Sequence, residues 1–240
     1  MKKLLFIINP MAGRQQAQTD LYKMVKIFAD HDYEVTVYPT RARLDCTRKV
    51  LEDAGRFDLV VCCGGDGTLN EMVSGMMQRQ DRRPMGYIPL GSTNDLAVSL
   101  RLPTRVEEAA LRAVTGNEFH MDVGTLNDRY FNYIAAFGAF TETSYATPQE
   151  IKNALGHLAY ILEGVKSLGK ILPIHVKITA DDEQFEEDYL FGAVTNTISL
   201  GGVLKLDPEK VLLDDGMYEL LLVKNPTNAL EAQAMLTAIM

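Results

Sequence analysis

The residues of this sequence that could carry out chemistry gather in loops rich in glycine and short polar side chains. The densest is Gly64-Gly65-Asp66-Gly67-Thr68, which follows an apolar stretch and precedes a helix-like one. Three glycines within four residues cost conformational entropy on folding, so they suit a backbone that turns sharply or lies against a ligand. The amino end of the following helix attracts phosphate, and Asp66 suits a divalent cation that holds phosphate oxygens. A purely structural turn is the alternative, although two glycines would be enough for one.

Two further loops have a similar setting. Asn9-Pro10-Met11-Ala12-Gly13 leaves the first apolar stretch and offers backbone amides at a helix start. A plain strand-to-helix turn explains this loop at least as well. In the loop at 89–97, the helix-capping residues Ser92-Thr93-Asn94 precede Asp95, which suits a first helical turn. Capping explains each of these residues singly, but it does not explain why a second acidic loop follows a neighbouring strand.

The elements that must position these loops alternate along the first half of the chain. Predicted strands cover 4–8, 34–38, 59–63 and 85–88, and predicted helices cover 21–28, 44–54, 69–76, 95–100 and 106–114. Strands separated by helices predict a doubly wound, mostly parallel sheet with helices on both faces. Ligands bind beyond the carboxyl ends of the strands in such sheets, so the three loops are expected at one edge.

The pattern changes after residue 117. Predicted strands then follow one another at 121–126, 129–136, 174–179, 189–197 and 218–223, with a helical stripe inserted at 149–170. This indicates an antiparallel β-rich domain with an inserted helical segment. Residues 1–117 hold 16 basic and 14 acidic side chains, a net +2, whereas 118–240 hold 8 and 18, a net −10. The sequence therefore predicts two domains, 1–117 and 118–240.

Composition excludes several classes of protein. A net charge of −8 disfavours nucleic acid as a partner, because phosphate backbones need clustered Lys and Arg. No apolar run is long enough for a signal peptide or a transmembrane segment, which favours a cytoplasmic protein. Cys46, Cys62 and Cys63 lack metal-ligand spacing and are expected to be small buried hydrophobes. The four histidines also lack ligand spacing, so no zinc site or histidine-based catalytic triad is predicted.

The three loops, in this order, resemble the diacylglycerol kinase catalytic family of lipid kinases. A fourth stretch, Leu213-Asp214-Asp215-Gly216-Met217, also matches the family. Gly-Gly-Asp-Gly-Thr alone is shared with NAD kinases and resembles phosphofructokinases, but the set of four is more specific. The resemblance covers nearly the whole chain and is closest to the soluble bacterial diacylglycerol kinases of Gram-positive type. Ser92 and Leu96 stand where the family more often has Thr and Phe.

The resemblance implies that 1–117 is an ATP-binding domain and 118–240 a lipid-substrate domain, with ATP and Mg²⁺ as cofactors. Asp66, Asp95 and Asp122 would form the catalytic network around magnesium. Asp215 and the carbonyls of Leu212 and Met217 would hold a structural magnesium, although a tight turn explains 213–217 as well. The implied ATP site comprises Asn9, Pro10, Met11, Ala12, Gly13, Thr40, Gly64, Gly65, Asp66, Gly67, Thr68, Leu69, Asn70 and Ser92.

The expected reaction is phosphoryl transfer from ATP to the hydroxyl of diacylglycerol, which gives phosphatidate. Phosphatidylglycerol, a sphingoid base and NAD remain alternative substrates, and a noncatalytic nucleotide-binding regulator remains an alternative role. A lipid substrate at the membrane surface implies transient, peripheral membrane association. The stripe at 149–170 could contact a membrane, but it more simply packs on the second sheet. The sequence leaves a homodimer open.

One family feature is missing from these 240 residues. An Asp-Gly-Glu motif, which the resemblance implies as the source of the proton acceptor, occurs nowhere in the sequence. Either the chain is shortened or the base is lost, and the apolar ending at 235–240 favours a shortened chain. The sequence therefore predicts that this chain transfers little or no phosphate to lipid.

Overall fold

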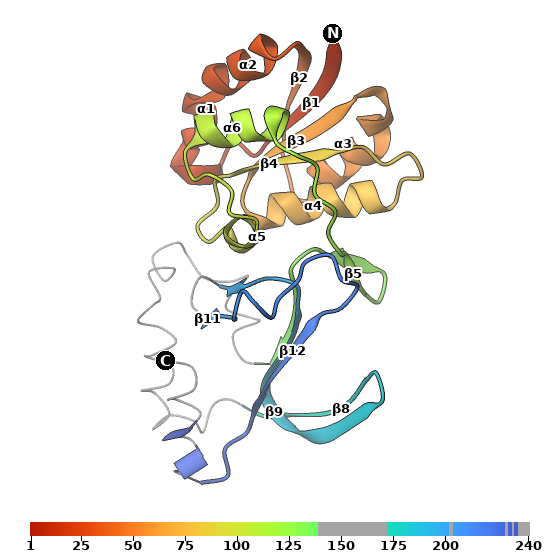
Figure 1. The fold of residues 1–240 in the computed structure, drawn as a ribbon, viewed down its shortest axis with the longest axis vertical. Coiled ribbons are helices and arrows are strands. Elements are labelled where there is room, and N and C mark those ends of the chain that lie inside the picture. The colour runs from red at the N-terminus through yellow and green to blue at the C-terminus, as the bar shows by residue number, and fades with distance from the viewer. Residues whose placement is uncertain (139–171, 202–203, 229, 232, 235–240) are drawn as a thin grey trace. The chain divides into compact units, whose positions relative to one another are not determined.

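The computed structural model describes residues 1–138, 172–201, 204–228, 230–231 and 233–234 (Figure 1). Its contacts divide the chain into two compact units, each made of segments that are separate in sequence. The first unit contains Met1–Tyr133 and Thr197–Met217, and the second contains Ile134–Asn196 and Tyr218–Met240. This division does not coincide with a single split at 117, because the segment at 197–217 returns to the first unit.

A four-stranded parallel sheet forms the centre of the first unit. Its order is β2 (Tyr33–Pro39), β1 (Lys2–Ile8), β3 (Leu59–Gly64) and β4 (Met85–Pro89). Leu4 of β1 pairs with Val35 on one side and with Leu59 on the other. All four strands therefore end at the same edge of the sheet, as the sequence predicts.

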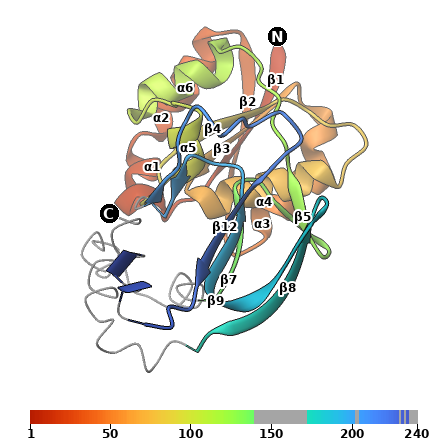
Figure 2. The same ribbon diagram turned by 60° about the horizontal axis from the view of Figure 1, so that its bottom comes forward.

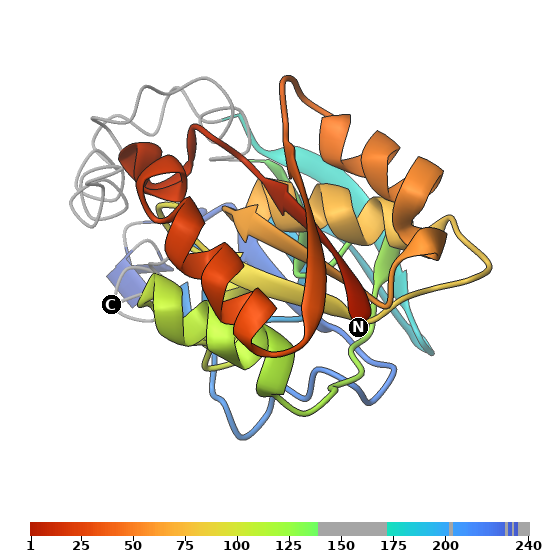
Figure 3. The same ribbon diagram turned by 90° about the horizontal axis from the view of Figure 1, so that it is seen from above.

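Helices cover both faces of this sheet, because successive side chains of a strand point to opposite faces. Leu4, Phe6 and Ile8 of β1 pack against one group of helices, whereas Leu5 and Ile7 pack against another (Figure 3). The first group consists of η1 (Ala12–Gln15), α1 (Gln16–Thr19), α2 (Leu21–Asp30) and α6 (Val106–Thr115). The second consists of α3 (Asp45–Asp53), η2 (Ala54–Arg56), α4 (Asp66–Met77) and α5 (Asp95–Ser99).

Gly75 in the last turn of α4 allows α3 to approach closely. A Cβ at this position would lie 2.8 Å from the Thr47 carbonyl oxygen and 2.9 Å from the Val50 Cβ. We expect Gly75→Ala to destabilise the protein by about 1–2 kcal/mol net, because the overpacking cost exceeds the gain in helix propensity. Gly67→Ala in the same helix is the matched control, since its Cβ would meet nothing within 4 Å. Urea unfolding of both variants measures the difference, and an unchanged or raised stability of Gly75→Ala would contradict this account.

Two short antiparallel pairs complete the first unit. One is the hairpin of β5 (Gly124–Leu126) and β6 (Arg129–Phe131), and the other is β10 (Ser199–Leu200) with β11 (Leu204–Lys205). The expected strand at 129–136 is in fact two strands, because the chain leaves the ladder at Asn132 and Tyr133 before β7 begins.

The second unit contains an antiparallel sheet. β9 (Glu183–Thr195) pairs with β12 (Glu219–Lys224), with β7 (Ile134–Gly138) and with β8 (Ile174–Ala180) (Figure 2). The predicted α/β class, with a parallel sheet followed by antiparallel β-structure, is confirmed. The predicted helical insertion at 149–170 lies outside the described residues.

The three cysteines are buried and free, as predicted. No helix in the described part of the chain is long and apolar enough to cross a membrane.

Candidate functional site

The carboxyl edge of the parallel sheet carries the three loops that the sequence singles out, and backbone hydrogen bonds join them. The Asn9 amide donates to the Cys63 carbonyl at 2.9 Å, and the Leu90 amide donates to the Gly64 carbonyl at 2.7 Å. Thr40 reaches the same edge, since its amide donates to the Ile8 carbonyl at 2.9 Å. The structure therefore brings the three predicted loops together at one edge, and it adds the chain after β2, where Thr40 lies.

The glycines of these loops have different roles. A Cβ on Gly91 would lie 2.5 Å from the Gly65 Cα, and a Cβ on Gly64 would lie 2.5 Å from the Thr68 Oγ1. Gly65 and Gly91 are therefore needed for the close contact between their two loops, and Gly64 is needed for its contact with Thr68. A Cβ on Gly67, in contrast, would meet no atom within 4 Å. The space beside Gly67, at the amino end of α4, is therefore open.

Asp66 is the first residue of α4, and its carboxylate is largely enclosed. Its Oδ2 accepts a hydrogen bond from the Asn94 amide at 2.9 Å. Its Oδ1 is buried, and no hydrogen bond of ordinary geometry reaches it within the described residues. Burial and the nearby negative charge of Asp95 raise the pKa of Asp66 above its ordinary value. The backbone amides of Leu96 and of Asp66 itself also act on the carboxylate and lower its pKa, but by less than burial raises it. A cation at Oδ1 would both satisfy this oxygen and offset the repulsion between the two carboxylates.

Asn94 holds the loop that contacts Asp66. It has a left-handed backbone, with φ of 55°, and it lies at the N-cap of α5 without capping it through its side chain. Instead its Oδ1 accepts the Gly91 amide at 2.8 Å, and its Nδ2 donates to the Gly91 carbonyl at 2.9 Å. The Tyr87 hydroxyl also donates to this Oδ1 at 3.1 Å. Capping therefore does not explain this side chain, which braces its own loop.

We expect Asn94→Ala to lower stability by about 2 kcal/mol, because it removes these bonds and strains the left-handed backbone. Asn94→Gly removes the same bonds but suits the backbone, so about 1 kcal/mol should be lost. Denaturant unfolding of both variants separates the two contributions. An equal loss in both would show that the backbone conformation carries no cost.

Asp95 is the first residue of α5, and it bonds to the segment at 197–201, which belongs to the first unit. Its Oδ1 accepts the Ser199 hydroxyl at 2.6 Å, and its Oδ2 accepts the Gly201 amide at 2.9 Å. The Asp95 carbonyl accepts from Ser99 at 3.2 Å and from Thr197 at 3.4 Å. The side chain is thus buried and anchored. This structural role is additional to the catalytic one that the sequence resemblance implies.

Asp122 lies with the fourth motif. Its amide donates to the Leu213 carbonyl at 2.8 Å, and its Oδ2 accepts the Gly216 amide at 2.6 Å. The Asp215 Oδ1 accepts the Met217 amide at 2.9 Å, and Gly216 has a φ of +77°. The motif is therefore a tight turn stabilised by two carboxylates. One oxygen of Asp215 remains for a cation, together with nearby carbonyl groups.

The remaining predicted ligand residues have four different settings. Asn9 orients Thr68, since its Nδ2 donates to the Thr68 Oγ1 at 3.3 Å. Asn70 donates to the Tyr130 carbonyl at 3.5 Å, and its buried Oδ1 has no hydrogen-bond partner in the part of the chain described. Ala12 and Leu69 are buried in the two cores, so they could contact a ligand only through their backbones. Pro10, Met11, Gly13 and Ser92 lie in the loops at the edge of the sheet.

The donor set fits a partly hydrated magnesium ion shared with phosphates. Among the described residues, no three His, Cys, Asp or Glu side chains are placed to enclose a metal. Mg²⁺ commonly keeps several waters and uses one or two carboxylates together with substrate phosphates. The unpartnered oxygens of Asp66 and Asn70, beside the amino end of α4, meet this requirement.

Sequence reasoning missed three residues of this site. Tyr87 braces Asn94, Ser199 bonds Asp95, and Glu71 accepts amides from the loop before α3. Glu71 had a sequence signal, because it lies one turn after Thr68 on the same helix. Ser199 had none, since its contact spans about half of the chain.

The sequence of this chain is similar to those of known proteins. The family described as the diacylglycerol kinase catalytic domain matches residues 3–126. A Bacillus subtilis (strain 168) protein named diacylglycerol kinase is 37% identical, over 93% of this chain and 74% of that protein. A protein of the same name from Staphylococcus saprophyticus is 32% identical, over 93% and 73%.

Solved structures agree with the sequence relatives. The crystal structure of a diacylglycerol kinase from Bacillus anthracis superposes with a TM-score of 0.78 at 28% identity, and the match covers 99% of this chain and 77% of the other. Another structure from that organism gives a TM-score of 0.83 at 30% identity, with the same coverage.

Proposed function

Because this chain belongs to the diacylglycerol kinase catalytic domain family, a family of lipid kinases, we propose that it uses ATP and Mg²⁺ to phosphorylate the hydroxyl of diacylglycerol, which gives phosphatidate. The observation that carries the ATP and Mg²⁺ part is the buried, unpartnered Oδ1 of Asp66 at the amino end of α4. A carboxylate in this position repels a bare phosphate but suits a cation that accompanies one.

The proposed nucleotide site is the carboxyl edge of the parallel sheet. The backbone amides at the start of α4 and the loop at Asn9–Gly13 would receive the phosphates. Asn9 holds the Thr68 hydroxyl in place, and Asn94 holds Asp66. Magnesium, when bound, neutralises charge on the phosphates. Thr40, Asn70 and Ser92 belong to this proposed site by their places at the edge of the sheet.

Asp95 and Asp122 have positioning roles in the proposed site. Asp95 orients α5 against the returning segment at 197–201, which keeps its charge close to Asp66. Asp122 supports the turn that contains Asp215. That turn, with carbonyls of Leu212 and Met217, is proposed as a second magnesium site of structural importance.

Nucleotide binding tests the first part of this proposal. We expect ATP to raise the melting temperature of the protein when Mg²⁺ is present, with a smaller shift for ATP alone and none for NAD. A shift with NAD that exceeds the shift with Mg-ATP would favour an NAD kinase and overturn the proposal. No shift with any nucleotide would overturn it as well.

Radiolabelled phosphate transfer tests the substrate. Diacylglycerol, phosphatidylglycerol, sphingosine and NAD are offered in parallel, and label is expected in phosphatidate above the other products. Predominant label in another lipid would reassign the substrate. Mg-ATP binding without label in any lipid would agree with the low turnover predicted for these 240 residues and would also fit a noncatalytic regulator. The low turnover, the transient membrane association and the homodimer all stay predictions.

A further inference from the structure

The loop between β2 and α3 is basic and has an exposed apolar tip. It covers residues 40–44 and, with the first turn of α3, brings Arg41, Arg43 and Arg48 close to Leu44. We define Arg41, Arg43, Leu44 and Arg48 as the arginine–leucine tip. No motif of the proposed catalytic site includes these four residues.

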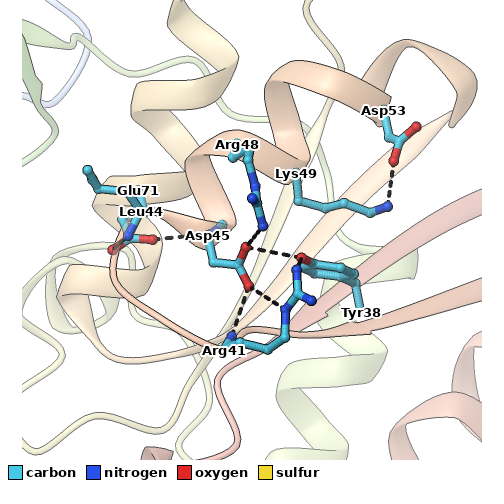
Figure 4. Close-up of polar contacts among 9 residues, drawn as sticks. Tyr38, Arg41, Leu44, Asp45, Arg48, Lys49, Asp53 and Glu71 are labelled. Atoms are coloured by element: carbon cyan, nitrogen blue, oxygen red, sulfur yellow. Dashed lines mark hydrogen bonds and ion pairs between the residues drawn. The ribbon is translucent and has the colours of Figure 1, made fainter.

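Leu44 is held in an unfavourable conformation. Its φ of 65° lies in the left-handed region, which a branched apolar residue rarely adopts, and the residue is 59% exposed. The conformation persists because the Glu71 carboxylate of α4 accepts the Leu44 amide at 2.9 Å and the Cys46 amide at 3.3 Å (Figure 4). Strain of this kind, with an apolar side chain directed to solvent, suits a contact with an apolar partner.

Two arginines of the tip, Arg41 and Arg48, contact one buried carboxylate, Asp45. Asp45 accepts hydrogen bonds from the Tyr38 hydroxyl at 3.1 Å and from the Arg41 amide at 2.9 Å, and it also pairs with Arg48 (Figure 4). The guanidinium side chains stay 71% exposed in Arg41 and 55% exposed in Arg48. Arg43 is exposed as well, and Asp45 and Glu71 are the carboxylates that contact the tip, so three arginines against two carboxylates leave it a net charge of +1 on a chain whose net charge is −8.

We propose that the arginine–leucine tip contacts the surface of a bilayer that contains anionic phospholipids. Leu44 enters the boundary between head groups and acyl chains, and the arginines contact lipid phosphates. A nucleic acid would also attract the arginines, but an exposed leucine adds nothing to a phosphate contact. This inference rests on the proposed lipid kinase function, for which it names the membrane-facing surface.

The tip is rigidly connected to the candidate site. Glu71 bonds the tip from the same helix that begins with Asp66, and the Thr47 hydroxyl donates to the Glu71 carbonyl at 2.9 Å. The tip also lies at the carboxyl edge of the sheet, where β2 ends at Pro39. Contact of the tip with a bilayer would therefore bring that edge, and the site on it, to the lipid surface.

A fluorescence experiment tests insertion directly, because the chain contains no tryptophan. Leu44→Trp provides one emitter at the tip, and Leu111→Trp provides a matched control at an exposed position of α6. Vesicles of equal parts phosphatidylglycerol and phosphatidylcholine should shift the emission of Leu44→Trp to the blue, and brominated lipid should quench it. An unshifted, unquenched Leu44→Trp, or an equal response of both variants, would overturn the proposal.

Vesicle flotation then tests the energetic role of the tip. Arg43→Gln combined with Leu44→Ser should bind these vesicles about tenfold more weakly than wild type, whereas phosphatidylcholine vesicles should bind neither protein well. Arg82→Gln combined with Leu111→Ser is the control, and it should bind as wild type does. Melting temperatures with Mg-ATP show that each variant is folded and binds nucleotide.

The outcomes distinguish this inference from the proposed function. If the tip variant binds vesicles as wild type does, and Mg-ATP still raises its melting temperature, the membrane contact is overturned and the kinase proposal stands. If the tip variant binds vesicles more weakly than wild type does, but Mg-ATP leaves the melting temperature of the wild-type protein unchanged, the membrane contact is supported and the kinase proposal is overturned. Binding of a short RNA that depends on Arg43, with vesicle binding unaffected by Leu44→Ser, assigns the tip to nucleic acid and overturns the proposal.

Discussion

Asp66→Asn should raise the thermal stability of the Mg²⁺-free protein and, at the same time, abolish its Mg²⁺-dependent ATP binding. Both effects come from one carboxylate oxygen, the buried Oδ1 that has no hydrogen-bond partner among the described residues. Without a cation, the charge of Asp66 is poorly solvated and close to Asp95. An amide has the same shape without the charge, and its oxygen still accepts the Asn94 amide.

The stability change depends on pH in a defined direction. Burial, and then the charge of Asp95, raise the pKa of folded Asp66 above the value of 3.8 for the unfolded chain. Between these two values the folded protein binds more protons than the unfolded chain, so wild-type stability falls as the pH rises through this window. Asparagine does not ionise, so the melting temperature of Asp66→Asn should exceed that of wild type at neutral pH. The difference should shrink below the unfolded pKa, where both side chains are neutral.

The binding change should be large. Removing the charge at the buried Oδ1 of Asp66 should weaken Mg-ATP binding about a hundredfold, or roughly 2.8 kcal/mol. Titration calorimetry with ATP, with and without Mg²⁺, measures this loss. Asp128→Asn, at an exposed position in the β5–β6 turn, is the matched control and should bind as wild type does. Mg-ATP affinity of Asp66→Asn within a factor of about three of wild type would remove Asp66 from the proposed cation site.

Local patterns in the sequence were sufficient to predict the first unit's sheet and the loops at its edge. The apolar runs at 4–8, 59–63 and 85–88 match β1, β3 and β4 closely, because a strand buried on both faces shows as a continuous apolar run. The position of Asp66 follows from the same reasoning, since a strand must end before a glycine-rich turn. What the pattern could not separate is a glycine required by a ligand from one required by another loop. Gly65 and Gly91 are of the second kind, because their backbones lie too close together for a Cβ on either residue.

Contacts between distant segments were beyond sequence reasoning. The chain between Arg129 and Ala136 shows no Gly or Pro, yet it leaves one ladder and enters another around the buried Asn132. The return of the segment at 197–217 to the first unit depends on pairs such as Ser99 with Thr197, whose hydroxyls lie 2.6 Å apart. Such pairs have no period or spacing that a single sequence reveals. The charge difference between residues 1–117 and 118–240 therefore reflects composition, and it does not mark the boundary between the two structural units.

Asp95→Ala should destabilise the protein by about 3–4 kcal/mol, because it leaves the Ser199 hydroxyl and the Gly201 amide without their charged acceptor. Asp95→Asn keeps one acceptor oxygen, so about half of this loss is expected. Urea unfolding measures the stability of these variants. Asp95→Ala, Ser199→Ala and the double variant, compared with wild type, form a double-mutant cycle.

Since Asp95 and Ser199 share one hydrogen bond, the sum of the stability losses in the two single variants should exceed the loss in the double variant by about 1 kcal/mol or more. Additive losses, or a loss below about 1 kcal/mol in Asp95→Ala, would show that this carboxylate does not hold the returning segment. A confirmed coupling would mean that the activity lost in any Asp95 variant reports structure as well as chemistry. Asp66, whose asparagine variant is expected to be more stable than wild type, is then the cleaner probe of the cation site.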